Sequence, residues 1–320
     1  MSEQDDESTE SMRSNATGSV AFVLTFGDFD DQSCRVIVVD WWGVGGQLRS
    51  QYSPCWRLIR VDPMSRVHLF EFNDQSWLPE AWRRYITEYL QFMLEHGPFD
   101  ELPALIARVV DGADEPRIVD LCSGSGGPWP TYLEEPLTEF EGVEVLLTDL
   151  HPHREAFERI EQRTEGRATG HDAPIDATDV PADVEGPRTI INGLHHFEPE
   201  QARAILADAV EKGVSIGVFE IMDRRAVSLI PLVLIPLFVL FLTPFVRPFR
   251  VGRLLWTYLL PVIPLMIFWD GLVSALRVYS PEELRVLVAD FDDYEWEIDS
   301  VPAGKGPQRI TYLIGEPQRS

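Results

Sequence analysis

Lysine is scarce in this sequence, and its charge is strongly of one sign. The chain has 27 basic residues against 52 acidic ones, a net charge of −25, and its only lysines are Lys212 and Lys305. Binding to nucleic acid needs clustered cations that neutralise phosphates, so we expect no nucleic-acid partner. Acidic surfaces of this kind are typical of extreme halophiles, whose proteins stay soluble at molar salt. The composition therefore predicts a halophilic protein, with an ordinary acidic protein as the alternative.

Cysteine is also rare, and a leader-like segment is missing. Cys34, Cys55 and Cys122 lie far apart, and none has the CxxC or Cys/His spacing of a metal site. This pattern predicts no disulfide framework, no metal site and a reducing compartment. Residues 1–18 lack the basic start and apolar run of a signal peptide. Because they are polar and acidic, we expect them to be disordered.

The hydrophobic pattern sharpens near Met64, which divides the chain into predicted regions. Residues 1–63 are expected to be an acidic, irregular extension, with Met64 as the natural start of the folded unit; alternatively, 19–63 adds strands to the fold. Residues 64–115 are expected to form a helical cover, and 116–320 the main domain. The cover is predicted from two apolar stripes at helical spacing, Trp82, Ile86, Leu90 and Met93, then Leu102, Leu105, Ile106 and Val109.

Strand and helix patterns alternate along the main domain, as expected of a parallel sheet covered by helices. A late helix is predicted after Ser280, where an N-cap serine precedes Pro281 and two glutamates. The predicted strands are Arg117–Asp120, Val143–Asp149, Thr189–Asn192, Ser215–Ile221, Tyr294–Val301 and Gln308–Ile314, and the main helices are Arg154–Thr164 and Pro199–Lys212.

A glycine-rich turn follows the first of these strands. Ile118 and Val119 lead to Asp120, after which the chain reads LCSGSGG. That pattern is typical of a buried parallel strand entering a tight turn, where the backbone passes close to a ligand. Exposed N–H groups in such a turn attract an anionic group.

Over 117–222 and 280–316 the chain resembles class I S-adenosylmethionine-dependent methyltransferases, with a haloarchaeal-type composition. The resemblance implies an α/β fold with a doubly wound, mostly parallel seven-stranded sheet and S-adenosylmethionine as cofactor. It implies methyl transfer to a small acceptor, which the apolar insertion described below suggests is hydrophobic or membrane-derived. The implied cofactor-binding residues are Asp120, Ser123, Gly124 and Gly126 for the methionine part, Asp149 for the ribose, Asp176 and Ala177 near the adenine, and Asn192 at the end of the fourth strand. Asp172-Ala173 is a less favoured match for the adenine pair.

Two adjacent histidines follow Asn192. In the family, this strand end faces the transferred methyl group, so the resemblance makes His195 and His196 the candidate catalytic residues. Histidine titrates near neutrality and could accept a proton from the acceptor. In-line placement can suffice for methyl transfer, so the alternative is that either ring caps the strand or packs under the cofactor. Glu220, Asp223 and Arg224, after the next strand, could also line the site or form a polar rim.

Two other functions compete with this interpretation. A nicotinamide-dependent oxidoreductase is less favoured because GSGGPW lacks the third glycine of GxGxxG and Asp120 stands where that fingerprint has no acid.

Family loops often carry glycine at the position of Cys122, where a side chain narrows the pocket or forces another backbone path. A non-catalytic, membrane-attached protein that retains the fold is therefore the second alternative.

Residues 226–269 form an apolar insertion broken by prolines. Positions 226–246 and 254–269 contain no charge. About 20 apolar residues can span a bilayer, but the prolines favour a re-entrant hairpin or a two-span hairpin. Arg224, Arg225, Arg247, Arg250 and Arg253 are the expected interfacial anchors. We therefore expect the protein at the cytoplasmic face of the membrane, taking a lipid-like acceptor; the alternative is a cytoplasmic protein with an apolar lid or dimer interface.

Overall fold

The computed structural model describes strands 22–26 and 35–39 and residues 66–97, 99–110, 117–134 and 137–318. The chain divides into two compact units, Met1–Val61 and Asp62–Ser320. In the first unit, β1 (Phe22–Phe26) pairs antiparallel with β2 (Arg35–Val39) in a two-stranded sheet of their own. The predictions for residues 1–18, Cys34, Cys55 and Met64 lie outside the described residues.

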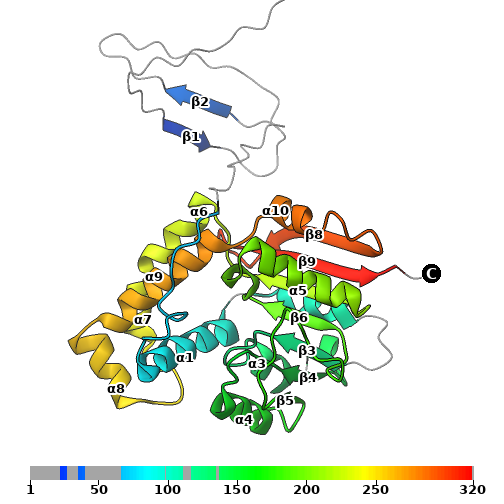
Figure 1. The fold of residues 1–320 in the computed structure, drawn as a ribbon. Helices are drawn as coiled ribbons and strands as arrows, with labels where there is room; N and C mark the ends of the chain where they lie inside the picture. The colour runs from blue at the N-terminus through cyan, green and yellow to red at the C-terminus, as the bar shows by residue number, and fades with distance from the viewer. Residues whose placement is uncertain are drawn as a thin grey trace, which may run out of the picture. The chain divides into compact units, whose positions relative to one another are not determined.

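The second unit is built on a mixed seven-stranded sheet (Figure 1). The strands lie in the order β5-β4-β3-β6-β7-β9-β8, and β9 is antiparallel to both of its neighbours while β3 to β7 are parallel. The α/β class and the seven strands agree with the sequence-based expectation. The bounds are β3 Arg117–Leu121, β4 Glu144–Leu147, β5 Ala168–Gly170, β6 Arg188–Ile191, β7 Ile216–Glu220, β8 Tyr294–Pro302 and β9 Arg309–Pro317.

The chain order of the parallel strands reverses between β3 and β6. From β3 the chain runs outward through β4 to β5, then returns to β6 on the other side of β3 and continues to β7. The connections after β3 and β6 therefore leave in opposite directions. In open α/β sheets, ligands bind in the crevice that this reversal opens at the carboxyl ends of the strands.

Helices cover both faces of the sheet, so the strands alternate between two cores. On β3, Ile118 packs into one cluster with α2 (Leu102–Ala107), α3 (Trp129–Glu134) and α4 (Arg154–Arg163). Its neighbour Val119 packs into the other, with α5 (Pro199–Glu211) and α10 (Pro281–Leu287). This alternation follows from the two-residue period of a strand. Ser280 caps α10 in a full capping box with Glu283, as predicted.

A third core joins the helical cover to the insertion, on one side of the sheet (Figure 1). The helices are α1 (Glu80–His96), α6 (Ala226–Leu229), α7 (Ile235–Leu242), α8 (Val251–Leu254) and α9 (Val262–Arg277), with short turns of tighter or wider helix between them. Tyr85, Ile86 and Tyr89 of α1 pack against Val239 of α7 and Ile263 of α9. The insertion is therefore fastened to the cover by its own hydrophobic cluster.

The predicted buried stripe of α1 is partly wrong. Ile86 is buried, but Leu90 and Met93 are 41% and 46% exposed. Tyr85 and Tyr89 take the buried face instead, because that face meets the insertion. The second predicted stripe is confirmed, since all four of its residues are buried in α2 and the turn after it.

In the part of the chain that the structure describes, no single helix is both long and apolar enough to cross a membrane. One pair, Val251–Leu259 and Val262–Arg277, passes that test together but is bent by 83°.

The arginines expected to anchor the insertion mostly have other partners. Arg253 is buried and donates to Glu88 of α1 at 2.6 Å, and Arg250 donates to the other oxygen of Glu88 at 2.6 Å. Arg224 pairs with Glu283 and Arg225 with Asp223. Arg250 and Arg253 thus fix the insertion to α1. These contacts do not support the expectation of interfacial anchors, which stays a prediction.

Candidate functional site

A cavity of about 530 Å³ opens at the carboxyl ends of the strands, where the chain order reverses. The turn after β3 contributes Cys122, Ser123 and Gly124, and the segment after β6 contributes Asn192 and Gly193. The far wall comes from α1 and from the loop that precedes it. The position agrees with the general location of ligands in doubly wound sheets.

The glycines of the turn have different roles. Gly124 has φ +55°, and a Cβ built on it would meet nothing within 4 Å, because this position faces the open cavity. Gly126 has φ +99°, and a Cβ there would lie 2.0 Å from Cδ1 of Ile160 on α4. Gly126 is buried and does not line the cavity, so the prediction that it contacts the cofactor is not supported by its position. It allows α4 to pack closely against the turn.

Asp120 lies beneath the cavity and does not line its wall. Its Oδ1 accepts a hydrogen bond from the hydroxyl of Thr189 on β6 at 2.7 Å, and its side chain is buried. Burial raises the pKa of this carboxyl to about 6, against the lowering effect of its hydrogen bonds. This position does not support the predicted direct contact with the cofactor; the side chain of Asp120 joins the ends of β3 and β6.

Ser123 lines the cavity, but its hydroxyl is engaged in the turn. It donates to the carbonyl of Asp120 at 2.8 Å and accepts from the N–H of Thr148 at 3.1 Å. These bonds hold the glycine turn against the end of β4. Ser123 therefore shapes the site through its backbone position.

Asp149 is an acid of the cavity lining whose carboxylate is held by the glycine turn. It follows β4, and its Oδ2 accepts from the N–H of Gly124 at 2.9 Å while Oδ1 accepts from the N–H of His151 at 2.8 Å. Each carboxylate oxygen has further lone pairs, so both can still accept hydrogen bonds from a ligand. The turn and the second strand thus fix the orientation of this carboxylate.

Of the two Asp–Ala pairs proposed to lie near the adenine, one reaches the cavity. Asp176 and Ala177 line it together with Ile175, whose N–H donates to the carbonyl of Asp149 at 3.0 Å. Asp172 and Ala173 are exposed and lie outside the lining. The favoured pair is therefore the one that the fold brings to Asp149.

Several buried polar atoms on the cavity wall have no hydrogen-bond partner. They are Asn192 Oδ1, Asn73 Oδ1, Arg84 Nε and Gln91 Oε1. Most buried polar atoms in proteins are paired, so a concentration of unpaired ones around one cavity indicates a polar ligand. Asn192 has φ +54°, and its N–H donates to Phe219 on β7 at 2.7 Å, which holds the residue at the end of β6.

Cys122 keeps a glycine-like backbone in spite of its side chain. Its φ is +57°, in the left-handed region, and it lines the cavity. Burial raises the pKa of its thiol above the usual range, so this cysteine is held as a neutral thiol. The sequence suggested that a side chain at this position either narrows the pocket or forces another backbone path. The backbone of the turn keeps its left-handed conformation, so the narrowed pocket fits the geometry.

The two histidines point to different places. His196 lines the cavity and is about a third exposed, with Nδ1 3.2 Å from Oδ1 of Asp74. His195 is buried and absent from the cavity wall; its N–H and Nδ1 lie 2.9 and 2.8 Å from the two oxygens of Glu220. The prediction of a catalytic role thus fits the position of His196, while His195 lies behind it.

Sequence reasoning missed the acids that surround these histidines. Glu71 and Asp74 lie in the loop before α1, and the guanidinium of Arg277 at the end of α9 is 3.0 Å from Glu71 and 2.9 Å from Asp74. Burial raises the pKa of Glu71 to about 7. Burial opposes ionisation of Asp74 too, but His196 and Arg277 hold its pKa well below the usual range. An acid between two phenylalanines, as in Phe70-Glu-Phe72, was the available signal.

No family model matches the sequence, and no curated protein matches it. Similar solved structures include an O-methyltransferase family protein from Burkholderia thailandensis (14% identity, 74% of this chain and 59% of that chain, TM-score 0.43). An O-methyltransferase family 2 protein from Planctomyces limnophilus DSM 3776 in complex with apigenin gives 15% identity, 74% and 62% coverage and TM-score 0.41. The mitomycin 7-O-methyltransferase MmcR gives 16% identity, 76% and 69% coverage and TM-score 0.40. All three are O-methyltransferases. The chain spans less than two thirds of the length of the first two. At these identities and TM-scores the likeness assigns neither substrate nor activity to this chain.

Proposed function

We propose that this protein transfers a methyl group from S-adenosylmethionine to a small, hydrophobic acceptor. One observation carries the proposal: the carboxylate of Asp149 is held beside the open glycine turn at the point where the strand order reverses. A fixed carboxylate there can accept hydrogen bonds from two neighbouring ribose hydroxyls. The Rossmann alternative is less favoured, because its third glycine is missing and the acid Asp120 supports the sheet.

The residues around the cavity fit this cofactor. Asp149 would hold the ribose, and Ile175, Asp176 and Ala177 would lie along the adenine. The open face of Gly124 leaves room for the methionine part, where a Cβ would otherwise intrude. When bound, the cofactor supplies an electrophilic methyl group on a sulfonium. The unpaired Oδ1 of Asn192 provides an acceptor for a cationic or N–H group at the same wall.

The chain's own contribution to the reaction is placement. The helix α1 closes the far wall of the cavity, so an acceptor bound between α1 and the strand ends is oriented and shielded from water. His196 and Asp74 stand on that wall and offer polar groups to the acceptor. A small acceptor with one polar group and an apolar body suits this lining.

Calorimetry with S-adenosylmethionine and with NAD tests the proposal. We expect the full chain to bind S-adenosylmethionine and not NAD, and Asp149→Ala to weaken binding by roughly 10- to 100-fold, since hydrogen bonds to a charged group contribute about 1.5–3 kcal/mol. Asp172→Ala is the matched control and should bind normally. NAD binding, or an unchanged affinity in Asp149→Ala, would refute the assignment. A second assay incubates the protein with S-adenosylmethionine and a membrane lipid extract and uses mass spectrometry to look for a methylated component. If the protein binds the cofactor but no component gains a methyl group, the non-catalytic alternative is favoured.

We further propose that the insertion docks onto a lipid surface and that the acceptor comes from it. The outer side of the insertion exposes large apolar side chains, including Val233, Leu237, Phe241, Phe245, Val251 and Leu259. A segment that exposes this many large apolar side chains is a candidate interaction surface. Residues 226–269 contain no acidic side chain, in a chain whose net charge is −25. Arg247 is exposed, and its guanidinium donates to Pro244 O at 3.5 Å with no carboxylate among its described partners. A phosphate headgroup beside an apolar surface fits this combination.

Vesicle flotation tests the lipid proposal. The protein should float with phosphatidylglycerol-containing vesicles in high salt, and Phe241→Glu with Leu259→Glu should weaken that binding at least tenfold, because two charges would enter the apolar region. Val286→Glu changes an equally exposed apolar residue on α10 and serves as the control. Protein that stays wholly in the aqueous fraction at every lipid concentration would refute the proposal.

A further inference from the structure

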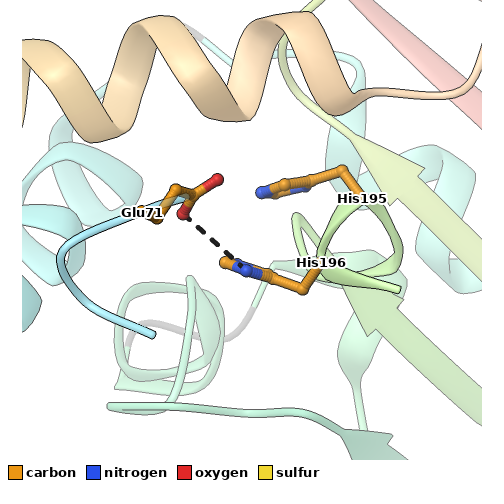
Figure 2. Close-up of side chains that lie close together, drawn as sticks. All are labelled: Glu71, His195 and His196. Atoms are coloured by element: carbon orange, nitrogen blue, oxygen red, sulfur yellow. Dashed lines mark ion pairs between the residues drawn. The ribbon is translucent and has the colours of Figure 1, made fainter. Parts of the chain in front are cut away.

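Three side chains of kinds that commonly bind metal ions lie close together, and one of them, His196, also lines the cavity. Glu71, His195 and His196 each offer one ligand atom, and these atoms lie within 4.8 Å of one another. Figure 2 shows the Glu71 carboxylate and the two imidazole rings turned toward a common point. Glu71 comes from the loop before α1, and the histidines come from the turn after β6. Local spacing in the sequence gives no sign of this cluster, because its members meet only in the fold.

The strongest indication of a ligand is the free nitrogen of His195. Its side chain is 1% exposed, and Nε2 is buried without a hydrogen-bond partner. Nδ1 lies 2.8 Å from a carboxylate oxygen of Glu220. An ionised carboxylate can accept hydrogen bonds but cannot donate them. In this pairing Nδ1 therefore carries the proton, and Nε2 has a lone pair. Leaving a buried polar atom unpaired destabilises the folded state unless a ligand satisfies it. The lone pair points toward Glu71, where it can bind a cation.

Charge at the cluster also favours a cation. Three carboxylates, Glu71, Asp74 and Glu220, lie around the histidines, and Arg277 is the guanidinium that contacts the first two. Its nitrogen is 3.5 Å from Nδ1 of His196, so it occupies one side of the cluster. The acidic side chains around the histidines therefore outnumber the guanidinium that contacts them. A divalent ion would neutralise that excess in a buried region, where unbalanced charge is costly.

We propose that Glu71, His195 and His196 bind a divalent transition-metal ion through Oε2, Nε2 and Nδ1. Two imidazoles and one carboxylate suit Zn²⁺, Co²⁺ or Fe²⁺ better than Mg²⁺ or Ca²⁺, which prefer oxygen ligands. The pairing of Glu220 with His195 is the arrangement that orients metal-binding histidines. Oε2 of Glu71 lies 3.7 Å from Nδ1 of His196, while Oε1 is held by Arg277 and Ser274. Bonds of about 2.1 Å require only a small inward movement of these side chains.

The ion would lie behind His196, which also faces the cavity. From there it would act on the acceptor only through His196, whose ring orientation at the cavity wall it would fix, a use that rests on the proposed methyl transfer. Binding of the ion itself does not depend on that reaction. The two ideas can therefore fail separately.

Titration of the metal-free full chain with Co²⁺ tests the site. We expect one equivalent to bind with visible d–d absorption, Zn²⁺ to displace it, and Mg²⁺ to have no effect. His195→Gln and Glu71→Gln should weaken Co²⁺ binding at least tenfold, and Glu220→Gln should weaken it through the orientation of His195. His171→Gln, a histidine outside the cluster, is the matched control. Circular dichroism checks that each variant is folded, and His196→Ala, at a partly exposed position, serves if a buried variant unfolds.

The inference is overturned if the folded wild-type chain shows no saturable Co²⁺ binding. It is equally overturned if folded His195→Gln and His196→Ala both bind Co²⁺ as the wild type does. Calorimetry with S-adenosylmethionine on the same preparation separates the outcomes. Metal binding without cofactor binding leaves the site standing and refutes the proposed function, and the reverse result does the opposite.

Discussion

Asp120 serves the ends of neighbouring strands through both its side chain and its backbone carbonyl. The carboxylate accepts from Thr189 on β6, and the carbonyl accepts from the N–H and the hydroxyl of Thr148 at the end of β4, each at 2.9 Å. These bonds require a short polar side chain at this position. They do not require that the side chain be charged. A neutral side chain of the same shape can therefore be used to measure how much the buried charge lowers the free energy of unfolding.

Replacing Asp120 with asparagine should change how stability depends on pH. The folded-state pKa of Asp120 is raised from 3.8 to about 6, so its contribution to stability is complete below pH 4 and is lost as the pH rises to about 6. Asp120→Asn lacks this loss and can still accept from Thr189. Relative to the wild type, its free energy of unfolding should therefore rise by about 2–3 kcal/mol between pH 4 and pH 7. Urea unfolding over that range measures the difference; a difference independent of pH would contradict the burial of the charge.

At the scale of single residues, the sequence indicated which acids matter better than what they do. Asp149 and Asp176 reach the cavity, as expected from the place of Asp149 at the end of a predicted strand and from the resemblance for Asp176. Asp120 and Gly126 belong to the same motif but serve packing, because the direction of a side chain depends on which neighbouring strand or helix it meets. Glu71 was missed because a buried acid with distant partners resembles a surface acid in an acid-rich chain.

At the scale of elements, the pairing of Glu88 with Arg253 and Arg250 connects α1 to the insertion. Glu88 and Arg253 are almost fully buried, 2.6 Å apart. Arg253 also donates to the carbonyls of Val246 and Pro248, so both of its terminal nitrogens have partners while Nε has none among the described residues. Removing one member of such a group leaves a buried charge without a partner.

Glu88→Gln should lower the free energy of unfolding by about 3 kcal/mol, because Arg253 then lacks a countercharge in a buried position. The exposed pair of Arg108 and Glu297 is the control, and Glu297→Gln should change stability by less than about 1 kcal/mol. Chemical denaturation measures both. If the two substitutions lowered the free energy of unfolding equally, burial of the Glu88 pair would have no effect on the cost of losing its charge. A double change of Glu88 and Arg253 to leucine should recover much of the loss.

The elements show where sequence patterns suffice and where they fail. Six sheet strands were predicted close to their observed bounds, because apolar runs between turn residues mark them. The strand β5, Ala168–Gly170, was missed because three small residues have no period and no β-branched core beyond Thr169. The helix α1 was predicted with the wrong face, since its partner is the insertion, and the sequence does not state which element a helix will meet.

At the scale of the whole molecule, the net charge of −25 opposes compaction, and salt should relieve it. We expect the melting temperature at pH 7 to rise as KCl is raised from about 0.1 M to about 3 M, where the screening length is a few ångströms or less. The rise should shrink near pH 4.5, the isoelectric point, because little net charge then remains to screen. Differential scanning fluorimetry at both pH values tests this. A melting temperature that falls with salt at pH 7 would contradict the halophilic prediction.

The helix α1 belongs to two surfaces of the molecule at once. Arg84, Thr87 and Gln91 lie on the cavity wall, while Tyr85 and Tyr89 lie in the core shared with the insertion. Any movement of the insertion that shifts α1 also reshapes the cavity. If the insertion docks onto lipid as proposed, thermodynamic reciprocity requires that lipid change the affinity for the ligand by the same factor as the ligand changes the affinity for lipid. Because α1 is shared by both surfaces, the proposed binding of lipid and the proposed binding of ligand would be coupled equilibria.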